Sequence, residues 1–420
     1  MSRLLRTDVA WALLPLLVAS ALVLQNGGWP WRGDWNWTID TIAGSTVLTG
    51  PLVGGLAAWM VVRAAALRPL TDTTPRRAWV VVRQAGLAAG LGLVAYALTA
   101  LVAVAITLAV PHGGDAGWAA LVIGPLVLAA CAMTGAALAL HLPHPLTALA
   151  VPVGLFLLGD LAPRPGPELL RHGPVTGSLA GLRFDLAVIA WHSLALAGLT
   201  ALLTLAALPS RDTSPLPRAR AALLVAGLLT GGTGTILTMS SPPERFVITA
   251  ERPDVCAGTP VQVCLPAAQQ RQLDRILPGV QQVAARLTAA GAALPDRFEA
   301  ALPGYRPPPE VGLLARGISD DLPTDPSALA ALLMRPSPCP DYFDPTARPG
   351  DEYAFATELL IAVAVATEPD AVITGPERAW LQQTDPAERR SWVARTYSAL
   401  RACDLEAVRL PDSLRAGLPE

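Results

Sequence analysis

Lysine is absent from this 420-residue chain, because every one of its 31 basic residues is arginine. A phosphate-binding P-loop, a Schiff-base enzyme and a Ser–Lys hydrolase each need a lysine, so the sequence excludes these three kinds of site. Histidine is scarce as well: there are five, and none follows Ser241. The C-terminal part therefore holds neither an H-E-x-x-H metallopeptidase motif nor a Ser–His or Cys–His pair.

Charge is also in short supply. Charged residues make up 15% of the chain, against about 25% in soluble domains. The net charge of −2 gives no basic surface for nucleic acid. Long uncharged apolar runs fill the chain before Ser241, whereas charged residues and proline crowd the part after it. This division predicts a transmembrane domain over residues 1–240 and a soluble domain over residues 241–420.

A helix needs about 20 apolar residues to cross the hydrocarbon core of a bilayer. The first apolar stretch, residues 9–25, also fits a cleaved signal peptide, with Ala19-Ser20-Ala21 behind its apolar core. The apolar run continues past that point, however, which favours an uncleaved helix. The fifth apolar stretch, residues 146–160, is the shortest and contains Pro152, so it also fits a re-entrant element. Seven spans are predicted, at residues 9–25, 41–67, 79–110, 118–142, 146–160, 186–208 and 221–239.

Arginine placement predicts the orientation, because cytoplasmic loops are rich in basic residues. With seven spans, the arginine-rich loops all fall on one side, except 161–185, where acidic residues balance the arginines. Tryptophans near the predicted span ends fit interfacial belts. We expect a multi-pass protein of the bacterial plasma membrane, with its N-terminus in the cytoplasm and its C-terminal domain outside. The arginines on the cytoplasmic side are Arg3, Arg6, Arg63, Arg68, Arg76, Arg77, Arg83, Arg211, Arg218 and Arg220.

Few polar features mark the predicted spans. His192 is the one ionisable group placed well inside a span, and it is interpreted as a hydrogen-bonded packing residue. This scarcity disfavours a proton or sodium symporter. Small-xxx-small glycine pairs predict close helix packing. These pairs are Gly50/Gly54, Gly86/Gly90 and Gly227/Gly231.

The C-terminal part predicts a mainly helical α+β domain. Segments 245–250 and 259–265 are β-prone, and residues 267–290 repeat apolar positions at helical spacing, with Pro278 a kink or break. Residues 352–366 predict a buried helix. A last helix begins after Asp385, which can cap it, with Pro386 in the first turn.

Four of the five cysteines lie in this domain, and an even number outside the cytoplasm predicts two disulfides. The natural local pair is Cys256–Cys264, which leaves Cys339–Cys403, although three pairings are open in principle. Metal ligation is the alternative, but the domain has no histidine and no C-x-x-C spacing. Cys131 falls in the fourth span and is interpreted as a packing residue.

No catalytic group emerges from the sequence. The acidic pairs Asp320-Asp321 and Asp351-Glu352 are adjacent in the chain, and adjacent side chains rarely converge on one substrate atom, so they are interpreted as exposed loop residues. The sequence predicts no enzyme activity, no cofactor and no metal site.

The membrane half resembles ABC-2-type export permeases in its cytoplasmic N-terminus and in its loop lengths. Residues 63–83 correspond in place to the segment that meets the ATPase in that family, and residues 161–185 to its extracytoplasmic helical element. The seventh span and the large C-terminal domain depart from the family pattern. Val255-Cys256, the run from Val263 to Pro266, Ser391-Trp392 and Leu400-Arg401 are similar to domains fused to such proteins in high-GC bacteria.

Two functions follow from these features. The resemblance implies a permease-like export subunit in the lipid bilayer, without its own ATP site. It would pair with a separate ATP-binding subunit, and a second copy of the chain is a further expected partner. The ATPase would dock at Arg63, Arg68, Arg76 and Arg77. The alternative is a membrane-anchored extracytoplasmic binding or sensing protein with no transport activity. An intramembrane enzyme is disfavoured, because the spans hold no paired aspartates and no Ser/His pair.

Overall fold

The computed structural model divides the chain into two compact units. A membrane unit comprises residues 1–109, 115–176 and 182–247, and a C-terminal unit comprises residues 110–114, 177–181 and 248–420. Within them the structure describes residues 2–25, 29, 31–65, 77–161, 178–207, 225–234, 245–249, 251–314, 325–340, 351–366 and 375–415.

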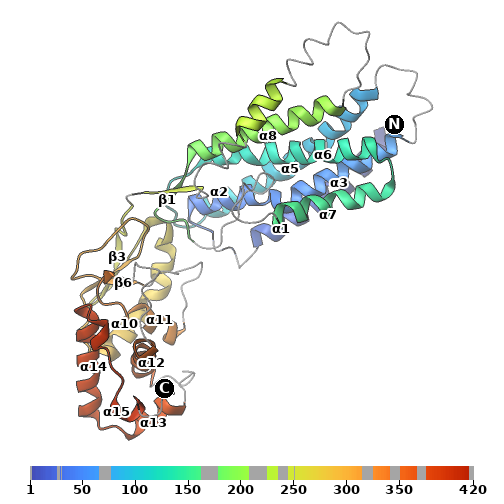
Figure 1. Cartoon of the computed structure of the whole chain (residues 1–420). Coiled ribbons are helices and arrows are strands. Elements are labelled where there is room, and N and C mark those ends of the chain that lie inside the picture. The colour runs from blue at the N-terminus through green and yellow to red at the C-terminus, as the bar shows by residue number, and fades with distance from the viewer. Residues whose placement is uncertain are drawn as a thin grey trace. The chain divides into compact units, whose positions relative to one another are not determined.

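The membrane unit is a bundle of helices that lie alongside one another (Figure 1). Helix α3 lies against α5, α6 and α7, while α6 also packs against α8, and α1 packs against α5. Residues 225–234 are helical too. The bounds are α1 Ser2–Gln25, α2 Trp35–Gly44, α3 Thr46–Ala65, α5 Arg77–Leu108, the 3-10 helix η2 Trp118–Val122, α6 Ile123–His141, α7 Pro145–Leu161 and α8 Leu186–Ala207.

Four stretches of helix are long and apolar enough to cross a membrane: Trp35–Ala64, Val81–Leu108, Trp118–His141 and Leu186–Ala207. Shorter apolar helices occupy Trp11–Gln25 and Pro145–Leu158. Six of the predicted spans fall on these helices, and the seventh falls partly on helical residues 225–234, with its ends outside the described residues. The prediction of several apolar helices suited to a membrane is confirmed, while the number seven and the orientation stay predictions.

The helix surfaces fit a lipid environment. Large apolar side chains point away from the protein interior, among them Leu101 and Leu149, each 68% exposed. Monomeric soluble proteins rarely present contiguous apolar surface of this kind. A bilayer is the solvent in which such a surface is stable.

Glycines set two of the closest helix contacts in the membrane unit. A Cβ atom added at Gly135 of α6 would collide with the carbonyl oxygen of Gly54 on α3, and one at Gly198 of α8 would collide with the backbone of Gly231. Two of the predicted glycine pairs, Gly50/Gly54 and Gly227/Gly231, therefore lie in helix contacts, as expected where lipid supplies no hydrophobic drive. The third pair, Gly86/Gly90, has no neighbouring atom within 4 Å of an added Cβ, so its predicted packing role is wrong for the described contacts.

Helix α2 corrects the sequence analysis at the start of the second span. The predicted span begins at residue 41 and leaves Asp40 outside it, but the helix already begins at Trp35, where the side chain of Asp34 accepts a hydrogen bond from the Trp37 amide. Nine of the ten α2 residues are buried, including Asp40 at 0% exposure. Asp40 is thus a buried ionisable group near the start of an apolar stretch of helix, in addition to His192, which is buried in α8.

The C-terminal unit is built on a four-stranded sheet in the order β3-β4-β5-β6. Strands β4 (Gln262–Leu265), β5 (Arg297–Ala300) and β6 (Gly312–Leu314) run parallel, and β3 (Val255–Ala257) pairs antiparallel with β4. Helix α10 (Gln270–Ala289) connects β4 to β5, as a parallel crossover requires.

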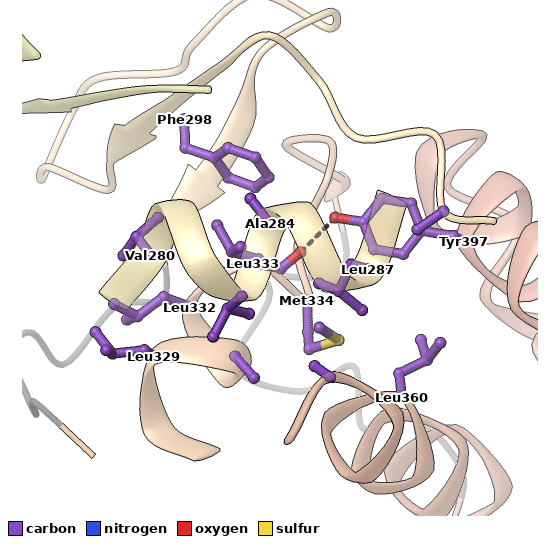
Figure 2. Packing of buried hydrophobic residues seen from close by; sticks show 14 of the residues in the cluster. Val280, Ala284, Leu287, Phe298, Leu329, Leu332, Leu333, Met334, Leu360 and Tyr397 are labelled. Carbon is purple, nitrogen blue, oxygen red and sulfur yellow. Dashed lines mark hydrogen bonds between the residues drawn. The ribbon is translucent and has the colours of Figure 1, made fainter. Parts of the chain in front are cut away.

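Helix α10 lies between Phe298 of the sheet and the remaining helices of this core (Figure 2). Phe298 reaches one side of α10, while Leu333 and Leu360 approach it from other elements. Tyr397 is fully buried, and its hydroxyl donates to the Leu333 carbonyl at 2.6 Å. The other elements are η3 Ala267–Gln269, α11 Pro326–Leu332, α12 Asp351–Val365, α13 Gly375–Gln383, α14 Pro386–Arg401, η5 Leu405–Ala407 and α15 Asp412–Arg415.

Most elements predicted for this half of the chain are present. Strand β2 (Phe246–Ile248) falls in the first β-prone segment and pairs with β1 (Leu182–Phe184), and β4 falls in the second. Asp385 caps α14 by accepting from the Ala387 amide at 2.7 Å. Pro278 lies inside α10 without ending it, so a break there was wrong.

Candidate ligand-binding pocket

The sheet of the C-terminal unit has two faces of different character, because successive side chains of a strand point to opposite sides. Phe298 faces α10, so its neighbour Glu299 faces the other side. The register aligns Glu299 with Cys264 of β4 and with Leu313 of β6. A carboxylate therefore lies beside Cys264 on this face of the sheet, with only 3% of Glu299 exposed.

Both oxygens of Glu299 have partners. Nη2 of Arg297, two residues earlier on the same face, lies 2.6 Å from Oε1. The Tyr305 hydroxyl donates to Oε2 at 2.7 Å. Burial, together with this hydrogen bond and the charge of Glu299, raises the pKa of Tyr305 above its ordinary value against the opposing charges of Arg252 and Arg297. Tyr305 therefore stays a neutral hydroxyl at physiological pH.

This triad of Arg297, Glu299 and Tyr305 forms part of the wall of a pocket of about 620 Å³. The volume lies within the range of about 300–1,000 Å³ that is typical of small-molecule sites. Segments that precede β3, β5 and β6 supply most of the lining, and Arg401 at the end of α14 completes it. The pocket thus gathers residues that are far apart in the chain.

The charges in the pocket are mixed. The ion pair of Arg297 and Glu299 neutralises itself, which leaves two arginines, Arg252 and Arg401, and three acidic residues. Arg401 donates from Nη1 to the Ala293 carbonyl at 3.0 Å. Within the part of the chain that the structure describes, the side chain of Arg252 forms no hydrogen bond or ion pair, and the same holds for the three acids. The acids are Asp254, Asp296 and Glu310.

One donor of the triad also lacks a partner. Nε of Arg297 is buried, and among the described residues it has no hydrogen-bond partner. A buried donor left unpaired costs about 1–3 kcal/mol. This donor and the charged groups around the pocket favour a polar ligand over an apolar one.

A second polar feature lies in the membrane unit. Nη1 of Arg245 lies 3.6 Å from Oδ1 of Asp40, whose side chain is fully buried in α2. One turn away, Asn36 donates from Nδ2 to the Leu182 carbonyl at 2.6 Å. The Arg245 carbonyl in turn accepts from the Asp185 amide at 2.9 Å. These contacts hold the β1–β2 ribbon against α2, which is a structural role.

The four cysteines of the C-terminal unit lie in two pairs at disulfide-bonding distance. Cys256 pairs with Cys264 across β3 and β4, with a Cα separation of 4.1 Å. Cys339 pairs with Cys403, just beyond α14, with a Cα separation of 5.3 Å. Cys131 is a buried free thiol in α6. No group of three metal-ligating side chains is found among the residues described.

The residues predicted to dock an ATPase are described only in part. The guanidinium of Arg63, near the end of α3, lies 4.6 Å from the ring centroid of Trp59. Arg77 begins α5, and its side chain is not among those described. Arg68 and Arg76 lie outside the described residues, and docking at these four positions stays a prediction.

One acidic pair was misplaced by the sequence analysis, and the other lies outside the described residues. Asp351 and Glu352 are in the first turn of α12, not in a loop. Partial burial acts to raise the pKa of Glu352, but hydrogen bonds from the Leu410 amide and from Arg415 outweigh it, and the pKa is lowered. This glutamate therefore ties the C-terminal segment to α12. Asp320-Asp321 falls in a stretch whose structure is not described.

The sequence analysis assigned no binding role to any pocket residue and named only Arg401, as part of the resemblance. Their one local signal is Arg297-Phe298-Glu299-Ala300, in which apolar and charged residues alternate as in a strand with one buried and one polar face. A comparison with known proteins finds no matching family model, no matching curated protein and no matching solved structure.

Proposed function

We propose that this chain is a membrane-anchored binding protein whose C-terminal unit faces the outside of the cell and holds a small polar ligand in the pocket beside Glu299. The apolar helices are the anchor, and the C-terminal unit is the receptor. The single observation that carries this proposal is a carboxylate that is 3% exposed, held at both oxygens, in the wall of a pocket of suitable size.

Burying the carboxylate of an ion pair in a small domain rarely adds stability compared with an apolar residue of similar volume, and here Glu299 is 3% exposed whereas Arg297 is 42% exposed. The triad therefore has a better rationale as a preorganised wall of a binding site than as a source of stability. With Tyr305 and Arg297 fixed by Glu299, a ligand would meet polar groups that are already oriented: the Tyr305 hydroxyl oxygen as an acceptor and the Arg297 guanidinium as a donor. Such preorganisation lowers the entropic cost of binding.

Two observations support the outward orientation. Arginine gathers in the loops that the seven-span topology assigns to the cytoplasm. The C-terminal unit also has two cysteine pairs at bonding distance, and disulfides persist mainly in oxidising compartments. The proposed location is the bacterial plasma membrane, with the binding domain outside.

The test is a ligand screen on the purified full-length chain in detergent. Thermal stability is measured with a library of small polar compounds on three proteins: the natural sequence, the pocket variant Tyr305→Phe with Arg252→Gln, and the control Arg395→Gln. Arg395 is an exposed arginine of α14 that does not line the pocket. We expect at least one compound to raise the melting temperature of the natural and control proteins but not of the pocket variant. Hits that stabilise all three proteins equally, or no hits at all, would refute the proposal.

The export-permease prediction is separable from this proposal by one deletion. A permease core that lacks residues 241–420 would still assemble with its ATP-binding subunit, whereas a binding protein would lose its whole activity. If the chain is purified from its native host and no ATPase is recovered with it, the result favours the binding protein.

A further inference from the structure

We infer that the ligand is a small zwitterion of the short-peptide kind, with a carboxylate that pairs with Arg252 and an ammonium group that lies among the acidic residues of the pocket. This inference rests on the proposed function, because it names the chemical class that the same pocket would hold. It starts from the charged residues of the pocket that do not belong to the Arg297–Glu299 ion pair.

Arg252 is the group that would receive the carboxylate. Arg252 lines the pocket, and its charge is close enough to Tyr305 to oppose the rise in the phenol's pKa. Its side chain has no hydrogen bond or ion pair within the described residues. Guanidinium binds carboxylate through two parallel hydrogen bonds, which fixes direction as well as charge. The Tyr305 hydroxyl donates to Glu299, and its oxygen still has lone pairs for an ammonium or amide donor.

The acidic residues exclude a purely anionic ligand. Asp254, Asp296 and Glu310 outnumber the two arginines that remain after the internal pair is set aside. A phosphate or a dicarboxylate would meet more repulsion than attraction in this field. A ligand with one group of each sign matches it, because its ammonium offsets the acids while its carboxylate takes Arg252.

The space between the charges is apolar and stiff. Leu294 and Val311 line the pocket together with Pro253, Pro295 and Pro308. Proline fixes its own backbone φ angle, so these walls are preformed. They suit the aliphatic part of a short peptide, whose polar ends the charged residues would hold.

The experiment compares three forms of one ligand on the full-length protein in detergent. A panel of dipeptides with apolar side chains is screened by calorimetry, and the tightest is then tested with free termini, with an acetylated N-terminus and with an amidated C-terminus. Each form is measured on the natural protein and on Arg252→Gln, with Arg252→Lys as the variant that keeps the charge. Arg252 is exposed, so both variants should fold, which an unchanged melting temperature verifies.

We expect the free dipeptide to bind and each cap to weaken binding at least about tenfold, because each removes a hydrogen bond to a charged group. In Arg252→Gln, amidation of the dipeptide should weaken binding no further. In Arg252→Lys, amidation should again weaken binding, by less than in the natural protein. Equal binding of the free and capped forms, or no dipeptide binding, overturns the inference. If a compound from the ligand screen binds through the pocket while the dipeptides do not, the proposed function is retained and the zwitterion inference is rejected. If neither binds, the proposed function and the zwitterion inference are both rejected.

Discussion

Removing the disulfide between Cys339 and Cys403 should destabilise the C-terminal unit more than removing the one between Cys256 and Cys264. A cross-link stabilises a protein mainly by limiting the unfolded chain, and the effect grows with the loop that it closes. The two bonds close loops with sequence separations of 64 and 8, for which the chain-entropy relation gives about 4.3 and about 2.5 kcal/mol. The difference between them is therefore about 1.8 kcal/mol in the free energy of unfolding.

The assay uses the full-length protein in detergent, with both cysteines of a pair replaced by alanine. After equilibration in a urea series, a brief protease pulse digests unfolded C-terminal units, and the surviving fragment is quantified. Cys131→Ala is the control, because this free thiol lies in the membrane unit and should leave the urea midpoint unchanged. A larger drop in the urea midpoint when the shorter loop is opened, or no drop for either pair, would show that the two bonds do not stabilise the domain as argued.

Three further substitutions test the packing. Tyr397→Phe removes a buried hydrogen bond and should cost about 1–3 kcal/mol in the same urea assay; an unchanged midpoint would contradict the buried pairing. Gly135→Leu should force α3 and α6 apart and lower the melting temperature of the membrane unit in detergent, whereas Gly90→Leu, at a position with no neighbouring atom within 4 Å of an added Cβ, should be nearly neutral; equal effects would argue against the contact. Arg245→Ala should cost roughly 3 kcal/mol by leaving a buried carboxylate without its arginine. Adding Asp40→Asn should restore most of the lost thermal stability, and a double variant no better than the single one would refute the ion pair.

The elements that sequence reasoning predicted best are those set by a local pattern. Apolar runs predicted the helices of the membrane unit, because a hydrocarbon solvent imposes length and composition directly. The start of α14 followed from Asp385 and Pro386, since capping depends on neighbouring residues. The Cys256–Cys264 pair needed only two adjacent strands.

What sequence reasoning missed depends on contacts between distant segments. The charge of Asp40 interrupts the apolar run, so the predicted span began after it, whereas its pairing with Arg245, about 200 residues later, offsets part of the cost of burying it in a helix. The pocket joins Arg252, Glu299 and Arg401 from three separate parts of the chain. No local periodicity indicates that these side chains meet.

Cysteine accessibility in intact cells tests most directly whether the C-terminal unit is an outward-facing binding domain. Cells that express the Cys131→Ala form are treated with a membrane-impermeant maleimide, with and without prior treatment with an impermeant reductant. The account predicts labelling of Cys256, Cys264, Cys339 and Cys403 only after reduction, without permeabilisation. Labelling that needs permeabilised cells and no reductant would place the unit in the cytoplasm with free thiols, and would contradict the account.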